Sequence, residues 1–294
     1  MPELPETETI ARDLNARIVG TRITGVTVLR EDVLRGADAA TLEALTLGRE
    51  VARVWRRAKL IVLDLLPATT CERGARSAHE HHSTEDLVHI VVQPRFTGAL
   101  LVDDGTLPAD LADYLTVSFT LHDGRTLHYR DVRRLGTVAV MSNAGFLASS
   151  AALGPEPLDA SFTAQALCDA LGDSSRAIKA ALMDQSRLAG VGNIYATESL
   201  WEAGIDPSRA VRSLTASQWS ALHSALQRIL HASVALRGTS FRDYRDASGG
   251  RGGFVSELQA YGREGQPCAQ CGRRLIATHA IDGRNTVFCA TCQR

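Results

Sequence analysis

Hydrophobic and polar positions alternate with two different periodicities along the chain, one before and one after about residue 145. The first part carries short runs in which β-branched and aliphatic residues cluster or alternate with polar ones, as is typical of strands. The second part carries segments in which apolar residues recur every three or four positions, as is typical of amphipathic helices. Strands followed by helices indicate two separately packed regions and not an alternating α/β fold.

The strand-like part predicts single strands and one hairpin. The hairpin covers residues 115–131, where two alternating runs flank Asp123-Gly124, a favoured turn dipeptide. The single strands are expected at residues 21–29, 60–66, 87–93 and 99–105. The helices are expected at residues 163–171, 176–184, 193–204 and 215–236. In the last of these, Thr215 and Gln218 have the spacing of a capping box.

The first residues predict a helix with an unusual start. Pro5 suits a first helical turn, and the glutamates around it complement the positive end of the helix dipole. Apolar residues then recur every four positions from Ile10 to Ile18, and Gly20 is suited to end the helix. A helix start explains the glutamates but does not explain Pro2, which directly follows the initiator methionine.

The composition fits a globular protein that is long enough for two domains. Of its 294 residues, 45% are hydrophobic and 22% are charged, which excludes a disordered chain. No run reaches the roughly 18 apolar residues that span a bilayer, and the N-terminus lacks a basic segment followed by an apolar one. We therefore expect a cytosolic protein.

The net charge of -1 conceals two local features. Lys59 and Lys179 are the only lysines among 32 basic residues, which makes their positions conspicuous. Basic residues also cluster in residues 53–59 and 263–294. Such clusters fit a polyanion-binding face or ordinary solvated surface, and composition does not choose between the two.

Two polar stretches are expected to be loops. Residues 68–86 interrupt two strands and carry His79, His81 and His82, to which we assign no metal and no function because no cysteine pair or rigid element accompanies them. Residues 245–253 (RDASGGRGG) hold too many glycines for a packed element. We expect them to form a flexible loop that is able to close over a ligand.

The C-terminal cysteines form the strongest single motif. The C-x2-C spacing occurs twice, which is typical of a four-thiolate zinc ribbon. The four cysteines are Cys268, Cys271, Cys289 and Cys292. Because four thiolates fill all coordination positions of the metal, we expect one structural Zn²⁺. Disulfides are the alternative, and they are disfavoured because the chain shows no secretion signal. A hairpin between the pairs would carry Arg284 at its tip, where it suits a phosphate.

A glycine-containing turn, AGVGN, joins two predicted helices at residues 189–193. It would expose main-chain N–H groups at the start of the second helix, beside Asn193, and helix N-termini bind phosphate readily. Lys179 lies one short helix upstream, where it suits a second phosphate oxygen. Such turns also occur in purely structural roles, so the motif alone leaves both interpretations open.

Pro2 gains a chemical meaning if Met1 is removed. Its secondary amine would then be the N-terminus, and an α-amine, with a pKa of about 8, is far more often neutral near physiological pH than a lysine is. Such an amine attacks an aldehyde-level carbon to give an iminium, the covalent strategy of Schiff-base enzymes. Glu3 would serve as the adjacent acid or base, and Lys59 would supply a cation to the developing charge.

Over nearly its whole length the chain resembles the formamidopyrimidine-DNA glycosylase/endonuclease VIII family of bifunctional base-excision repair enzymes. The resemblance rests on PELPETET, RRAK, LGPEPL, AIKAALMDQSRLAGVGNIYATESLWEAGIDP, ELQAYGREGQPC and the closing zinc ribbon. PELPE in place of PEGPE makes the chain look like the branch that removes oxidised purines, such as 8-oxoguanine and formamidopyrimidines. The branch that removes oxidised pyrimidines is the alternative.

The resemblance implies roles for residues already singled out. Pro2 would attack C1′ of the damaged nucleotide, expel the base and form the imine that leads to β- and then δ-elimination. Glu3 would move protons around the sugar, and Lys59 would meet a phosphate. The residues implied in shaping the pocket or holding the DNA are Glu6, Gln93, Phe96, Arg133, Leu135, Lys179, Asn193, Glu198 and Arg284. The 245–253 loop would cover the everted base.

Two motifs depart from the family's pattern. QPRFTG stands where HLGMSG is usual, so Gln93 replaces a phosphate-contacting histidine and Phe96 replaces a methionine that fills the gap left by the flipped base. DVRRLG stands where DPRRFG is usual, so Arg133 would still face the orphaned base while Leu135 replaces a phenylalanine wedge. Both apolar replacements are able to wedge a base step, but the opposite-base preference stays open.

The resemblance also implies an α+β multidomain fold. We expect an N-terminal two-sheet β-sandwich with flanking helices over residues 1–148, a helix-two-turn-helix domain with the lesion-capping loop over 149–262, and a zinc-ribbon finger over 263–294. We expect a hinge near residue 148 and double-stranded damaged DNA in the cleft between the domains. The protein is expected to act as a monomer in the cytoplasm, at the nucleoid. The alternatives are a non-catalytic zinc-ribbon protein that binds bent or damaged DNA, and a zinc-dependent enzyme.

Overall fold

The computed structural model describes residues 2–67, 86–241 and 243–294. These residues pack as two compact units, each with its own apolar core. The first unit comprises Pro2, residues 6–150 and residues 241–251, and the second comprises residues 3–5, 151–240 and 252–294. The expected loop with His79, His81 and His82 lies outside the described residues, except for Asp86.

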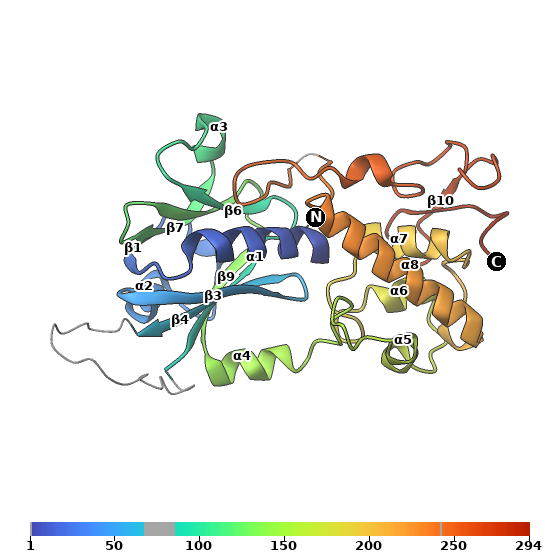
Figure 1. Cartoon of the computed structure of the whole chain (residues 1–294), viewed down its shortest axis with the longest axis horizontal. Helices are drawn as coiled ribbons and strands as arrows, with labels where there is room; N and C mark the ends of the chain where they lie inside the picture. Colours follow the sequence, from blue (N-terminus) through green and yellow to red (C-terminus); the bar gives the residue numbers. More distant parts are fainter. Residues whose placement is uncertain (1, 68–85, 242) are drawn as a thin grey trace. The chain divides into compact units, whose positions relative to one another are not determined.

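Two sheets form the framework of the first unit (Figure 1). Their strands are β1 (Ile23–Val28), β2 (Leu34–Arg35), β3 (Arg49–Arg57), β4 (Leu60–Pro67), β5 (Val88–Gln93), β6 (Gly98–Asp103), β7 (Leu115–Leu121), β8 (Thr126–Asp131) and β9 (Thr137–Ser142). One sheet has the order β1-β7-β8-β6 and the other the order β2-β9-β5-β4-β3. Every pair of neighbours is antiparallel except β2 and β9, which are parallel.

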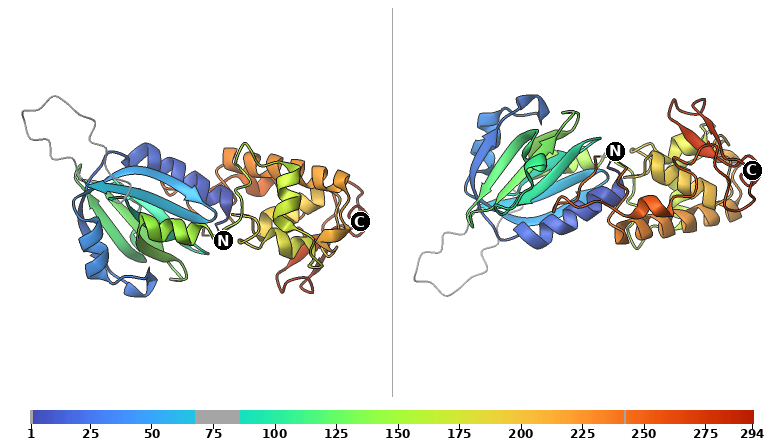
Figure 2. Two further views of the ribbon diagram at one scale, coloured as in Figure 1. Left: turned by 90° about the horizontal axis from the view of Figure 1, so that it is seen from below. Right: turned by 90° about the horizontal axis from the view of Figure 1, so that it is seen from above.

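The helices of the first unit flank these sheets. They are α1 (Leu4–Ile18), η1 (Glu31–Val33), α2 (Ala39–Thr46), α3 (Ala109–Ala112) and α4 (Asn143–Ser150). The apolar stripe of α1 is fully buried in one core together with residues of both sheets, and α1 runs beside the strands in both views of Figure 2. Gly20 follows the helix with φ of +80°, as expected for a terminating glycine. The predicted β-sandwich with a flanking N-terminal helix is confirmed.

All the strands predicted for the first part of the chain are present, and the hairpin has the expected turn. Leu121 N–H donates to Arg125 O at 2.8 Å, and Gly124 has φ of +89°. The sequence did not predict β3 or β9. The basic cluster of residues 53–59 lies largely on β3, where Arg56 binds Glu8 at 2.8 Å and Arg57 binds the Ser150 hydroxyl at 3.0 Å. Arg56 and Arg57 thus make hydrogen bonds within the protein, which neither interpretation of this cluster had included.

The second unit is mainly helical. Its elements are α5 (Ala164–Leu171), α6 (Ile178–Leu182), α7 (Asn193–Glu202), η2 (Val211–Ser213), α8 (Ala216–Ala235), η3 (Phe254–Glu257), β10 (Ile276–Thr278) and β11 (Thr286–Phe288). The predicted capping box begins α8: Gln218 N–H donates to Thr215 Oγ1 at 3.3 Å, and Thr215 N–H donates to Gln218 Oε1 at 3.1 Å. Within the described part of the chain, no helix has both the length and the apolarity to cross a membrane.

Residues 245–253 form a loop outside the helices and strands, as expected, but part of this loop is packed, which the sequence did not predict. Ala247 is fully buried in the core of the first unit, and Val102 N–H donates to its carbonyl oxygen at 3.2 Å. The Asp246 carboxylate accepts hydrogen bonds from the main-chain N–H groups of Ser248 and Gly250, at 3.0 and 2.7 Å. The glycines here allow a tight, hydrogen-bonded turn.

Candidate active site and zinc centre

Glu3 lies at the N-terminus of α7 in the second unit. Its carboxylate is buried, and Oε1 accepts a hydrogen bond from Ile194 N–H at 3.1 Å. The next residue is held as well, because Leu4 N–H donates to Gly190 O at 3.0 Å. The first N–H groups of a helix lack partners within the helix and carry the positive end of its dipole, so they stabilise a carboxylate there.

Both glycines of the AGVGN turn are needed to accommodate these residues. A Cβ atom at Gly192 would lie 2.4 Å from Glu3 Cδ, which is far inside van der Waals contact. Gly190 has φ of +81°, and a Cβ there would lie 2.7 Å from the Leu4 side chain. The turn is thus shaped around the N-terminal residues of the chain.

Gln185 holds the same turn, a role that was not predicted from the sequence. Its side chain accepts a hydrogen bond from Gly190 N–H at 2.9 Å and donates to Met183 O and Val191 O at 2.9 and 2.8 Å. The prediction that this segment offers free N–H groups to phosphate needs correction, because Gln185 and Glu3 accept from Gly190 and Ile194.

Lys179 on α6 is fully buried and donates from Nζ to Thr286 Oγ1 at 2.5 Å. Burial lowers its pKa to about 8, Asp282 and Glu3 oppose that shift, and Arg284 adds to it. Thr286 is itself buried at the start of β11 and was not singled out from the sequence. The two elements that carry the predicted phosphate-binding cations are therefore joined by this hydrogen bond.

Arg284 lies on the hairpin tip between β10 and β11, as predicted, with a side chain that is 59% exposed. Its Nη1 is 3.4 Å from Asp282 Oδ2 and 3.9 Å from the Met183 sulfur, so the tip lies beside the end of α6. Asn193, the first residue of α7, donates from Nδ2 to Asn285 O at 3.2 Å. The structure therefore brings Lys179, Asn193 and Arg284 to one hairpin.

Glu198 has a structural environment in place of the implied DNA contact. It is only 3% exposed, and its carboxylate accepts main-chain N–H groups of Gln259, Ala260 and Tyr261 at 2.8, 2.9 and 2.6 Å. Burial raises the pKa of Glu198, and the three hydrogen bonds oppose that shift. A buried carboxylate so engaged fixes the 259–261 segment and is unsuited to a phosphate.

In the first unit, two loops present the predicted wedge residues on one surface. Phe96 and Leu135 are 44% and 42% exposed, so both side chains are accessible to a partner. The Arg133 guanidinium carbon lies 5.0 Å from the centroid of the Phe96 ring, within cation–π range. Gln93 ends β5 nearby, and its Oε1 accepts a hydrogen bond from Arg95 Nε at 3.3 Å.

The remaining predicted site residues of the first unit are Pro2, Glu6 and Lys59. Lys59 lies in the two-residue turn between β3 and β4 and is partly exposed. Its neighbour Ala58 has φ of +53°, a conformation that a residue other than glycine adopts at a cost. Pro2 and Glu6 are buried, and Tyr244 OH donates to Glu6 O at 3.3 Å.

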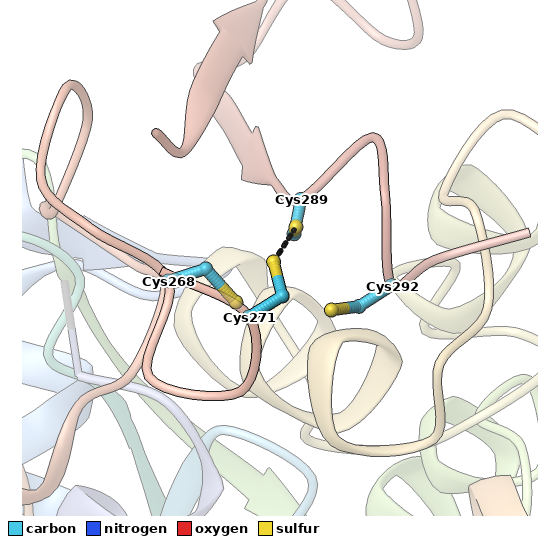
Figure 3. A group of neighbouring side chains, drawn as sticks. All are labelled: Cys268, Cys271, Cys289 and Cys292. Carbon is cyan, nitrogen blue, oxygen red and sulfur yellow. Dashed lines mark hydrogen bonds between the residues drawn. The ribbon is translucent and has the colours of Figure 1, made fainter. Parts of the chain in front are cut away.

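The four cysteines converge as the spacing predicted (Figure 3). Their sulfur atoms all lie within 4.8 Å of one another, and Cys271 Sγ is 3.5 Å from Cys289 Sγ. Four thiolates around Zn²⁺ at about 2.3 Å would be about 3.8 Å apart, so a zinc ion fits this set. Burial favours a raised pKa at Cys268, but the Gln270 amide, the Trp201 indole and the Cys271 amide together lower it. The hydrogen bond with Cys271 and burial raise the pKa of Cys292, so binding of the metal would displace protons from the set.

Comparisons with known proteins point to one family along the whole chain. The chain matches the sequence models of the formamidopyrimidine-DNA glycosylase N-terminal domain over residues 1–138, the formamidopyrimidine-DNA glycosylase H2TH domain over 153–245, and the zinc finger found in FPG and IleRS over 265–294. The formamidopyrimidine-DNA glycosylase of Moorella thermoacetica is 40% identical over 277 residues, 94% of this chain and 93% of that protein.

Two further proteins match over the full length of the chain. The formamidopyrimidine-DNA glycosylase of Desulfitobacterium hafniense is 35% identical over 295 residues, covering 100% of both chains. The structure of Lactococcus lactis Fpg (MutM) in complex with DNA containing N7-benzyl-Fapy-dG superimposes with a TM-score of 0.84 at 28% identity, again covering 100% of both chains.

Removing the metal should expose Trp201 of α7. This residue is 7% exposed and packs in one small core with Cys268 and Cys289, so loss of the ion should loosen its surroundings. We expect a chelator to release one zinc per chain and to shift tryptophan emission to longer wavelength. A W201F variant, which keeps Trp55 and Trp219, should not show the shift. Zinc release with unchanged emission from the wild-type protein would contradict this packing.

Proposed function

This chain belongs to the formamidopyrimidine-DNA glycosylase family, and from that premise we propose that it works through the amine of Pro2, with Glu3 as the proton carrier. It is a base-excision repair DNA glycosylase for oxidised purines, with the AP lyase activity of its family and one structural zinc. The observation that carries the residue assignment is the Glu3 carboxylate held at the N-terminus of α7, directly after Pro2. A carboxylate that is held in place one residue after the amine suits repeated proton transfer.

The proposed chemistry begins when the unprotonated Pro2 nitrogen attacks C1′ of the damaged nucleotide. The bond from C1′ to the base breaks, and the base leaves with the electron pair and takes up a proton. Glu3 protonates the sugar ring oxygen as the ring opens, which leaves an iminium between Pro2 and C1′. This electron sink permits loss of a C2′ proton and breakage of the C3′–O bond, and a second elimination then breaks the C5′–O bond.

We assign the DNA contacts to two groups of residues. One group lies at the β10–β11 hairpin, which carries Arg284 and is contacted by Lys179 and Asn193; these three residues would bind phosphates. Lys59 of the first unit would be a further phosphate contact. Phe96, Arg133 and Leu135 would enter the base stack, and Gln93 and Glu6 would complete the surroundings of the lesion. Glu198 keeps the structural role described above.

The substrate we propose is double-stranded DNA that carries 8-oxoguanine or a formamidopyrimidine, bound by one copy of the chain. The relatives are formamidopyrimidine-DNA glycosylases, and the DNA in the Lactococcus lactis complex contains N7-benzyl-Fapy-dG; both support this lesion class. We place the activity in the cytoplasm, at the nucleoid, where the DNA substrate lies and where thiols stay reduced for zinc. A turnover panel with 8-oxoguanine, formamidopyrimidine and thymine glycol would reveal an oxidised-pyrimidine preference instead.

Trapping with borohydride tests the Pro2 assignment. The protein without Met1 should form a covalent adduct with abasic-site DNA, because borohydride reduces the iminium. A Pro2→Gly variant should excise 8-oxoguanine about a hundredfold more slowly or worse, since the nucleophile is central to the reaction. A form with one extra residue ahead of Pro2 serves as the control with an intact fold. Full excision by either altered form would exclude Pro2 as nucleophile.

The lowered pKa of Lys179 predicts pH-dependent binding. Because its pKa is about 8, the ammonium should lose its charge between about pH 7 and about pH 9, whereas arginines stay charged. For a duplex with a stable abasic analogue, the slope of log affinity against log salt should decrease by about one over this range.

A Lys179→Met variant is the matched control for this titration. It keeps the N-terminal amine, which titrates in the same range, so any pH dependence left in the variant belongs to that amine. The variant should show the reduced slope at both pH values. Equal slopes for the wild-type protein at the two pH values would contradict a phosphate contact by a titrating Lys179.

A further inference from the structure

One buried hydroxyl joins the two loops that present Phe96 and Arg133. Thr97 lies in the turn between β5 and β6 and is 3% exposed. Its Oγ1 accepts a hydrogen bond from Arg133 N–H at 3.0 Å, in the loop between β8 and β9. The same hydroxyl donates to Asp131 Oδ1. A single side chain therefore makes two hydrogen bonds from the first loop to the second.

Asp131 organises the second loop around that contact. It is 1% exposed, and besides Thr97 it accepts hydrogen bonds from Tyr129 OH at 3.2 Å, Arg133 N–H at 3.2 Å and Gly136 N–H at 2.8 Å. Of these four donors, only Thr97 comes from the first loop. The carboxylate thus fixes the 131–136 loop, and the Thr97 hydroxyl attaches the 93–98 turn to it.

Gly136 lets the two loops approach each other, and Gly98 lets the first turn fold tightly. A Cβ atom at Gly136 would lie 1.9 Å from Tyr129 OH and 2.6 Å from Gln93 O, so no other residue fits without movement. A Cβ at Gly98 would lie 2.2 Å from Pro94 O within the first turn. Since the backbones meet this closely, the relative position of Phe96 and Arg133 is set by the buried link beneath them.

We propose that Thr97 is a positioning residue through which this enzyme reads the base opposite the lesion. Its hydroxyl holds the Phe96 turn against the Arg133 loop, so that the guanidinium stays stacked on the Phe96 ring while it faces the orphaned base. This inference rests on the proposed function, in which Arg133 and Phe96 enter the base stack. Thr97 acts from beneath and does not touch DNA.

The chemistry of the link suggests a clean substitution. Valine has the shape of threonine but neither donates nor accepts, so a Thr97→Val variant removes both hydrogen bonds that reach from the first loop to the second. Arg133 N–H would keep only its hydrogen bond to Asp131 Oδ1, within the second loop. The two loops would then shift independently, and the stacked pair would lose its fixed orientation. A Thr97→Ser variant keeps the hydroxyl. A Tyr129→Phe variant removes another donor to Asp131 without removing the link between the loops.

The experiment compares kcat/KM for excision of 8-oxoguanine opposite each of the four bases, in wild type and the three variants. For Thr97→Val we expect the ratio of kcat/KM between the best and the worst opposite base to fall about tenfold, or to one if the wild-type ratio is below ten. One oriented side-chain contact to a base gives discrimination of this order. Thr97→Ser and Tyr129→Phe should keep the wild-type ratio. Because the ratio is measured within one preparation, a smaller folded fraction cancels.

Cleavage of a single-stranded abasic site gives the second readout, because no opposite base is present there. Thr97→Val should retain wild-type single-strand cleavage per folded enzyme. An unchanged opposite-base ratio in Thr97→Val, or an equal loss in Tyr129→Phe, would overturn the inference while excision itself persists. Uniform excision opposite all four bases by the wild type would overturn it too. Absence of excision by the wild type would overturn the proposed function and this inference together.

Discussion

The hydrogen bond from Ile194 N–H to the Glu3 carboxylate is the contact on which the proposed chemistry depends. It fixes the residue next to Pro2 on a helix end, where the dipole favours a carboxylate. The Gly190 and Gly192 positions leave the space that Leu4 and Glu3 fill, and Gln185 holds the turn from the other side. In the proposed mechanism, this glutamate-rich helix start supports the amine of Pro2.

The same physical rule recurs at each buried charge. Removing an ion from water is costly unless hydrogen bonds replace the lost solvent, and here each replacement also fixes a loop. Lys179 bonds Thr286, three residues before the zinc-binding Cys289 on the same segment, so metal binding and the Lys179 position are linked through β11. Glu198 holds the 259–261 main chain, and Asp131 holds the 131–136 loop.

Sequence patterns predicted the elements whose causes are local. The α1 stripe, the Asp123-Gly124 hairpin, the α8 capping box and the cysteine pairs each depend on neighbours within a few residues. β3 was not predicted because four of its nine residues are arginines, which obscure the alternation of apolar and polar positions that is typical of a strand. The partners of Thr97 lie 34 and 36 residues away, and those of Glu198 lie 61 to 63 residues away, which no local pattern encodes. The packing within residues 245–253 was not predicted because glycines permit close packing as readily as motion. At Gly252, for example, a Cβ atom would lie 2.2 Å from Gly238 O.

A Gly192→Ala variant tests the central interaction most directly. Gly192 has φ of -136°, which alanine adopts without strain, so the added methyl group acts only through its overlap with the Glu3 carboxylate, 2.4 Å away. Single-turnover excision of 8-oxoguanine should fall about a hundredfold, as misplacement of a reacting group by about 1 Å can cause, while zinc content stays at one ion per chain. Excision at the wild-type rate would contradict the account.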